Sequence, residues 1–243
     1  MSRAALITGG SRGIGLAIAH GLAQDGWSLT LSARNADALA DAAAELRSTG
    51  ADVHVIPADM ADPDAPEALA GDIVQRVGRL DALILSAGMG NASPIVETPI
   101  RRLDTHYAVN LRAPFELTSR LIPLMRSTAE TEPNGVRVIA ISSLTARAAE
   151  PGLAAYGATK AALCSFCETL NVEESANGIL ATAICPGYVD TEMSSWKQGE
   201  LAADTMIRAS DIAELAVSLT RLSRNAVVPS LDVVRPGTSM WRA

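Results

Sequence analysis

The chain has 243 residues, with 20 Lys and Arg against 27 Asp and Glu, so its net charge is −7. This acidic balance argues against non-specific binding to nucleic acid, which needs clustered cations. Hydrophobic residues make up 48 % of the chain, enough for a sizeable core, yet no apolar run approaches the ~18 residues of a membrane helix. The composition therefore predicts a globular protein without a nucleic-acid or membrane partner.

The beginning of the chain and its cysteines suggest a compartment. Met1 is followed almost at once by the apolar run Ala4–Thr8, which leaves no room for a signal peptide. Three cysteines are an odd number, which speaks against a disulfide framework and favours a cytoplasmic location. Cys164 and Cys167 form a C-x-x-C inside a predicted helix, but no second pair accompanies them. Packing is therefore favoured over a zinc site, and we expect no metal.

Short apolar runs alternate along the chain with longer segments of helical period. This alternation predicts an α/β fold in one domain, residues 1–243, with a parallel sheet covered by helices on both faces. The predicted strands are Ala4–Thr8, Ser28–Ser32, Val53–Pro57, Ala82–Leu85, Arg137–Ser142, Leu180–Cys185 and Ala226–Val234. The predicted helices are Ile14–Asp25, Ala36–Ser48, Pro66–Val77, Ile100–Met125, Ala154–Asn177 and Asp211–Ser223. Glu130–Asn134 is interpreted as a polar surface turn.

The stretch Gly187–Arg208 has no clear strand character. Loops that follow the carboxyl ends of parallel strands often close over ligands, so we predict a substrate loop around residues 188–209. Met193, Trp196 and Met206 lie in this stretch. They either line an apolar substrate pocket or pack the loop, and the sequence leaves both interpretations open.

A glycine-rich turn follows the first predicted strand and begins the first predicted helix. It contains Gly9, Gly13 and Gly15, in the spacing G-x-x-x-G-x-G, with Ser11, Arg12 and Ile14 between them. The glycines allow a tight turn and close backbone approach, and the helix N-terminus offers free N–H groups to a pyrophosphate. No Lys-Ser/Thr pair follows the last glycine, so this is not a P-loop.

The residue after the second predicted strand indicates which dinucleotide the turn binds. Dinucleotide-binding folds usually place a carboxylate about 20 positions past the glycines, where it binds the ribose 2′-hydroxyl. Here Arg34 stands instead, and Arg12 adds a second cation. A guanidinium pairs well with a 2′-phosphate, so the sequence favours NADP(H) over NAD(H). The plain alternative is that both arginines are solvated surface residues.

Tyr156 and Lys160 stand four residues apart at the start of a predicted helix, which places both on one face. A free tyrosine has a pKa of about 10, too high for useful base chemistry at neutral pH. A neighbouring ammonium stabilises the phenolate, so the pair is a candidate acid–base centre in which Lys160 lowers the pKa of Tyr156.

Together these motifs resemble the short-chain dehydrogenase/reductases, in the single-domain branch of about 250 residues. The resemblance covers nearly the whole chain and implies a Rossmann-like, doubly wound parallel sheet of about seven strands. It is closest in appearance to the 3-oxoacyl carrier-protein reductases. The cofactor-binding residues that it implies are Gly9, Ser11, Arg12, Gly13, Ile14, Gly15, Arg34, Asp59, Met60, Ser86, Ala87, Gly88, Tyr156, Lys160, Pro186, Gly187, Val189 and Thr191.

The resemblance also implies catalytic roles. Tyr156 exchanges a proton with the substrate oxygen, and Ser143, which precedes it by 13 residues, binds the same oxygen. Lys160 holds the nicotinamide ribose, and Asn110 positions a water in the proton relay. One departure is Leu85-Ser86, where the family has two asparagines, and we expect a local change in packing there. The C-terminal segment Val233–Gly237 lacks the family's common Asp-Gly-Gly ending, which leaves the usual tetramer contacts open.

The implied activity is NADP(H)-dependent reduction of a ketone or β-ketoacyl thioester by hydride transfer. A close alternative is oxidation of a secondary or sugar alcohol, and an alternative of another class is a catalytically silent NADP-binding regulator. The resemblance further implies a homo-oligomer, a dimer or tetramer, in which Ile100–Met125 and Ala154–Asn177 pair with their copies.

Overall fold

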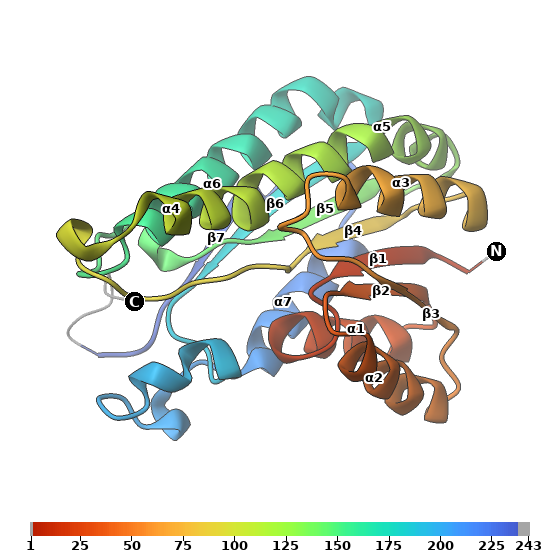
Figure 1. The fold of residues 1–243 in the computed structure, drawn as a ribbon. Helices are drawn as coiled ribbons and strands as arrows, with labels where there is room; N and C mark the ends of the chain where they lie inside the picture. Colours follow the sequence, from red (N-terminus) through yellow and green to blue (C-terminus); the bar gives the residue numbers. More distant parts are fainter. Residues whose placement is uncertain (1, 238–243) are drawn as a thin grey trace.

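Seven parallel strands form one sheet in the computed structural model, which describes residues 2–237 (Figure 1). The order across the sheet is β3-β2-β1-β4-β5-β6-β7, which confirms the predicted doubly wound architecture. The core strands contain almost only buried apolar residues, as expected of a sheet covered on both faces. The strands are β1 Ala4–Thr8, β2 Ser28–Ala33, β3 Val53–Pro57, β4 Ala82–Leu85, β5 Val136–Ile141, β6 Ile179–Pro186 and β7 Ser230–Val233.

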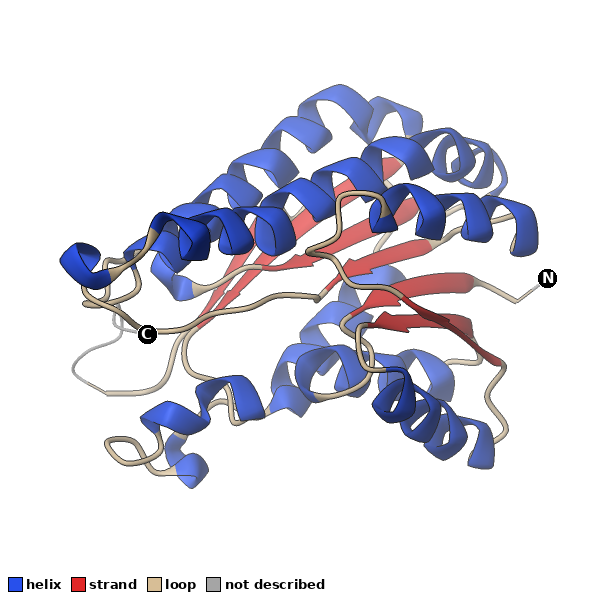
Figure 2. Cartoon of the chain, viewed as in Figure 1, coloured by secondary structure: helices blue, strands red, loops and turns tan. Residues whose placement is uncertain are grey.

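Helices cover both faces of this sheet (Figure 2). One layer holds α1 (Gly13–Gln24), α2 (Ala36–Ser48) and α7 (Ala209–Arg221), and the other holds α3 (Ala65–Arg76), α4 (Ile100–Tyr107), α5 (Ala113–Thr131) and α6 (Ala154–Glu174). Each helical layer packs against one face of the sheet and forms a separate hydrophobic cluster with it. Ala5 and Ile7 of β1 pack into the first cluster, and Leu6 between them packs into the second.

The strand order reverses between β1 and β4, and the candidate site lies where it reverses. Thr8, the last residue of β1, is paired with Ser32 of β2 on one side and with Leu85 of β4 on the other. The carboxyl ends of these strands therefore lie level at one edge of the sheet. Ligands of open α/β sheets bind at this position, where the connections diverge to opposite faces.

The predicted single helix Ile100–Met125 is wrong in one respect. The structure interrupts it with a π-helical turn, η2 (Ala108–Arg112), between α4 and α5. Pro114 explains the position of the interruption, because it has no N–H to donate to the carbonyl of Asn110 four residues earlier. α5 then continues to Thr131, so the predicted polar turn begins later than expected.

The C-terminal part also differs in detail from the prediction. β7 is shorter than the predicted strand Ala226–Val234, because the carbonyl of Ala226 accepts a hydrogen bond from the buried Arg137 side chain instead of continuing a strand. The predicted substrate loop holds two 3₁₀ helices, η5 (Glu192–Lys197) and η6 (Ala203–Thr205). A bridge between Val189 and Ile207 closes the base of this loop. Over residues 2–237, no helix combines the length and apolarity needed to cross a bilayer.

Candidate active site

The glycine turn after β1 packs closely against the segment that follows β4. Gly9 has a φ of +68°, and a Cβ there would lie 2.8 Å from the backbone nitrogen of Ala87. Gly15 is buried, and a Cβ on it would collide with the backbone of Gly9 and lie 3.2 Å from Ser86 Oγ. Only glycine fits these two positions without moving the backbone. The turn is therefore shaped by close contacts that a side chain would break.

The same turn leaves a helix N-terminus without a side-chain cap. α1 begins at Gly13, and Arg12 at its N-cap position makes no side-chain hydrogen bond to the helix. No acidic residue lies in the first turn of α1. Free N–H groups and the positive end of the helix dipole thus remain available to an anion, and the residues present fit the pyrophosphate of a dinucleotide. Ser11 and Ile14, between the glycines, are half-buried.

The two arginines that the sequence assigns to a 2′-phosphate differ in the structure. Arg34 follows β2 and is exposed. Arg12 forms an ion pair with Glu192, which lies at the start of η5 in the substrate loop. Arg12 thus already has a carboxylate partner, so Arg34 is the better candidate to bind a 2′-phosphate.

The other predicted cofactor residues lie along the same edge of the sheet. Asp59 follows β3, and its Oδ1 accepts a hydrogen bond from the N–H of Ala61. Met60 packs its side chain into the second hydrophobic cluster, which places that side chain in the core. The N–H of Ala87 donates to Thr8 Oγ1, which ties the end of β4 to the end of β1. Leu85, where the family has an asparagine, is 2 % exposed and belongs to the core.

The segment Pro186–Thr191 reaches from β6 over the glycine turn. Gly187 donates its N–H to the carbonyl of Val233, and Val189 is buried. A Cβ on Gly13 would lie 3.3 Å from Cγ2 of Thr191, so the end of this segment covers the start of α1. The structure thereby brings the first and last predicted cofactor motifs together.

Tyr156, Lys160 and Ser143 converge from α6 and the end of β5. Lys160 is 4 % exposed, and its Nζ donates to the carbonyl of Ile141 at 2.7 Å while lying 5.6 Å from the centre of the Tyr156 ring. Ser143 is also buried, and its Oγ accepts hydrogen bonds from the backbone and the hydroxyl of Thr145. Hydrogen bonds within the protein therefore hold the candidate side chains Lys160 and Ser143 in place.

Asn110 lies in the π-helical turn and is fully buried. Its Oδ1 accepts from the N–H of Met89, and its Nδ2 donates to the carbonyl of Met89 and to Thr159 Oγ1. A Cβ on Gly88 would lie 3.3 Å from Lys160 Nζ and 3.5 Å from Asn110 Oδ1. Asn110 therefore joins the segment after β4 to α6, the helix that carries the candidate tyrosine, Tyr156.

Burial is the largest cause of the pKa shifts of Tyr156 and Lys160. It raises the pKa of Tyr156 to about 12, although a hydrogen bond from Ser143 opposes the shift. It also lowers the pKa of Lys160 to about 8, a shift that the nearby Cys164 and Cys185 oppose. The pKa of Tyr156 is raised in this structure, so the lowering expected from Lys160 is not seen here. The ammonium donates a hydrogen bond to the carbonyl of Ile141 and lies 5.6 Å from the centre of the Tyr156 ring, and desolvation of the phenolate is the largest cause of the raised pKa.

Several residues at the site are not singled out by the sequence. Thr159 bonds Asn110, Thr145 bonds Ser143, and Gly90 and His106 lie against the Tyr156 ring. None has a motif of its own, because each acts through a contact with a distant segment. The sequence left open whether three loop residues line a pocket or pack the loop. Met206 is buried and packs the loop, while Met193 and Trp196 are 45 % and 46 % exposed.

Known proteins resemble this chain over most of its length. A family model described as short chain dehydrogenase matches residues 3–201. The chain is 33 % identical over 238 residues to a rhamnolipids biosynthesis 3-oxoacyl-[acyl-carrier-protein] reductase of Pseudomonas aeruginosa, which covers 98 % of this chain and 90 % of that protein. It is 31 % identical over 218 residues to a 1-deoxy-11-beta-hydroxypentalenate dehydrogenase of Streptomyces exfoliatus, covering 88 % of this chain and 78 % of that one.

Solved structures show the same fold. The alcohol dehydrogenase of the archaeon Thermococcus sibiricus, complexed with 5-hydroxy-NADP, superposes with a TM-score of 0.87 at 26 % identity, over 98 % of this chain and 100 % of that one. The Pseudomonas aeruginosa RhlG complex with NADP superposes with a TM-score of 0.86 at 32 % identity, over 95 % and 93 %.

Proposed function

The chain belongs to the short-chain dehydrogenase family, and we propose that it is an NADP(H)-dependent oxidoreductase that reduces a ketone or β-ketoacyl thioester to the secondary alcohol. The proposal rests on one cluster of residues. Buried Ser143 and Lys160 flank Tyr156, beside a glycine turn whose helix N-terminus has no side-chain cap. A module that only binds a nucleotide has no use for the first part of this arrangement.

The proposed cofactor site extends along the edge of the sheet. The glycine turn would hold the pyrophosphate, Arg34 the 2′-phosphate and Asp59 the adenine, while Pro186–Thr191 would cover the nicotinamide. NADP(H) bound there would supply the hydride, and that chemistry belongs to the cofactor. Structural relatives in complex with NADP, such as RhlG of Pseudomonas aeruginosa, support this choice.

The residues of the chain supply the proton and hold the substrate oxygen. Tyr156, with a pKa of about 12, is protonated at neutral pH and is therefore ready to donate its proton to a substrate carbonyl. Ser143 would donate a hydrogen bond to the same oxygen as negative charge develops on it. Asn110 Oδ1 has a second lone pair besides the one used by Met89, and this lone pair would hold the relay water.

The substrate class is inferred from the relatives together with the site. The 3-oxoacyl reductase from Pseudomonas aeruginosa, similar over nearly the whole chain, favours a β-ketoacyl thioester or a simple ketone. Oxidation of a secondary alcohol uses the same residues in reverse, and the alcohol dehydrogenase among the structural relatives keeps it as the second candidate. In that direction Tyr156 would accept the proton that it donates in the reduction.

The test is NADPH consumption against a panel of an acetoacetyl thioester, small ketones and quinones, with NADH in parallel. Turnover on one class with a preference for NADPH supports the proposal. Tight NADPH binding without turnover on any substrate, and with a Tyr156→Phe variant that binds equally well, would favour a silent NADP-binding regulator instead.

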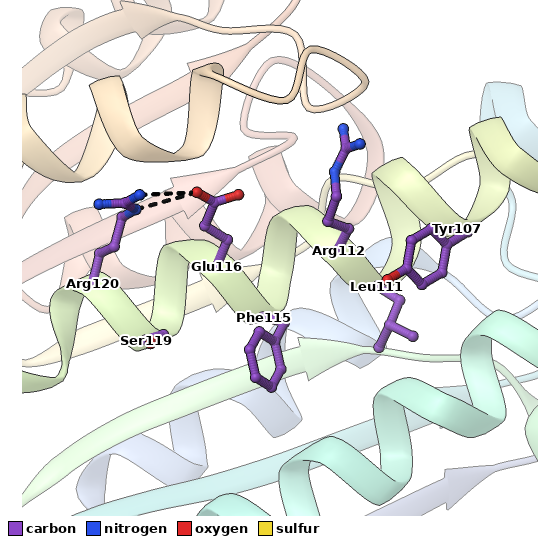
Figure 3. Close-up of a pocket in the computed structure, with 7 residues that line it drawn as sticks. All are labelled: Tyr107, Leu111, Arg112, Phe115, Glu116, Ser119 and Arg120. Carbon is purple, nitrogen blue, oxygen red and sulfur yellow. Dashed lines mark hydrogen bonds and ion pairs between the residues drawn. The ribbon is translucent and has the colours of Figure 1, made fainter.

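We also propose that the protein forms homo-oligomers through α4, α5 and α6. Apolar side chains are exposed on these helices, including Tyr107 at 50 %, Phe115 at 56 % and Val172 at 86 %. Figure 3 shows Leu111 and Phe115 on one side of this helical stretch and Arg112, Glu116 and Arg120 on the other. They border a groove of about 620 Å³ that does not include the catalytic residues. Apolar exposure of this kind is typical of an interface, and sedimentation showing only monomer would refute the proposal.

A further inference from the structure

His106 is a buried histidine of α4 that the proposed reaction does not use. Its side chain is 1 % exposed, and among residues 2–237 neither ring nitrogen has a hydrogen-bond partner. Buried polar atoms normally have a partner, because leaving them unpaired costs stability. An apolar side chain would fill the same place without this cost. Packing alone therefore does not explain why a histidine stands here.

The imidazole of His106 lies against the ring of Tyr156. The two ring centres are 6.3 Å apart and their planes meet at 67°, an edge-to-face arrangement that aromatic rings favour. The Tyr156 ring also faces Gly90, where a Cβ would lie 3.0 Å from ring atom Cδ2. The phenol is therefore in contact with His106 and with a backbone that only a glycine allows so close.

The helical stretch that carries His106 fixes Tyr156 by a second route. Asn110, four residues after His106, donates to Thr159 Oγ1, and Thr159 Oγ1 donates in turn to the carbonyl of Tyr156. Asn110 thus supports the backbone of Tyr156, and His106 contacts its ring. Both contacts come from the short segment around η2.

Charges around His106 favour its neutral form. Arg102 of the same helix and Lys160 of α6 are the charged groups that act on it, and the phenol of Tyr156 is the titratable group that faces it from α6. Burial, followed by these two cations, lowers the pKa of His106 below its ordinary value of 6.5, with no described carboxylate in opposition. Protonation would therefore place another positive charge in a buried, already cationic site.

We propose that His106 is a positioning residue whose neutral imidazole holds Tyr156 toward the substrate, and whose protonation in acidic solution releases Tyr156 and stops turnover. This proposal rests on the proposed function, in which Tyr156 donates the proton. The imidazolium, expelled from the cationic site, gives up its contact with the ring, and the phenol loses one of the two neighbours that orient it.

The test compares the pH dependence of kcat in His106→Phe with that of wild type, from about pH 5 to about pH 8. Phenylalanine keeps an aromatic ring beside Tyr156 but takes up no proton. We expect wild-type kcat to fall by up to about tenfold per pH unit at the acid end. His106→Phe should keep neutral-pH activity within about threefold and lose most of the acid fall. His54→Phe is the control, because His54 has a side chain 61 % exposed and lies beside Asp52.

Two readouts are independent of turnover. The chain has three histidines and three tyrosines, so imidazole and phenol resonances are few enough to follow by NMR. His106 should titrate below the ordinary histidine pKa of 6.5, and the Tyr156 ring signals should shift with it in wild type but not in His106→Phe. The variant should also unfold at a temperature no lower than wild type, because it removes two unpaired nitrogens. His106→Leu serves as a second variant if phenylalanine disturbs folding.

Three results would overturn the proposal. The acid fall in kcat persists in His106→Phe, or His106 titrates at or above the ordinary histidine pKa of 6.5, or the variant loses activity equally at every pH and is less stable. The last result would mark a purely structural residue. If no carbonyl in the panel is reduced, the proposed function fails. The joint shift of the His106 and Tyr156 resonances with pH still tests whether His106 acts on Tyr156.

Discussion

Gly15→Ala tests whether the glycine turn is shaped by close backbone contact. A Cβ at this position would lie 2.9 Å from the carbonyl carbon of Gly9 and closer still to its oxygen, so the turn itself has to move. Forcing a methyl group into a packed region costs ~1–3 kcal/mol. Alanine in a helix recovers ~1 kcal/mol relative to glycine. The expected net loss of stability is thus about 0–2 kcal/mol.

The displaced turn should weaken binding of the cofactor more visibly than folding. We expect the Kd for NADPH to rise at least about tenfold, which corresponds to ~1.4 kcal/mol. Gly71→Ala is the matched control, because Gly71 is an exposed glycine in α3 and a Cβ added there would meet no atom within 4 Å. That variant should gain ~1 kcal/mol in stability and bind NADPH as wild type does.

Urea unfolding and titration of NADPH fluorescence measure the two effects. The difference in unfolding free energy between the two variants, expected at about 1–3 kcal/mol, isolates the collision from helix propensity. If Gly15→Ala gains as much stability as Gly71→Ala and binds NADPH with unchanged affinity, the reasoning from close contact is refuted.

Three further substitutions test the site and the core. Tyr156→Phe should lower kcat at least about 100-fold while NADPH still binds, as shown by fluorescence titration, and retained turnover would remove Tyr156 as the proton donor. Arg34→Ala should weaken NADPH about tenfold and leave NADH unaffected, since a guanidinium–phosphate pair is lost, and equal losses for both would show that Arg34 does not bind the 2′-phosphate. Arg137→Met should cost at least about 2 kcal/mol in urea unfolding, because the buried guanidinium donates to four backbone carbonyls, and a loss below about 1 kcal/mol would contradict this account.

The elements near the start of the chain were predictable from local pattern. Ala4–Thr8, Val53–Pro57 and Ala82–Leu85 have the predicted ends, because each is a short apolar run bounded by glycine, proline or polar residues. The π-helical turn was not predicted, although Pro114, its physical cause, is visible in the sequence. The helical spacing of apolar residues does not show where one backbone hydrogen bond is missing.

By itself, the sequence determined the parallel fold, the glycine turn and the identity of the candidate catalytic side chains. These depend on local spacing and on residue type, which the chain carries directly. Only the tertiary structure decided that Arg12 pairs with Glu192, 180 positions away, and that His106 lies against Tyr156. It also decided the direction of the Tyr156 pKa shift. Burial and charge at a site are contributed by segments distant in sequence, so they exist only once the chain is packed.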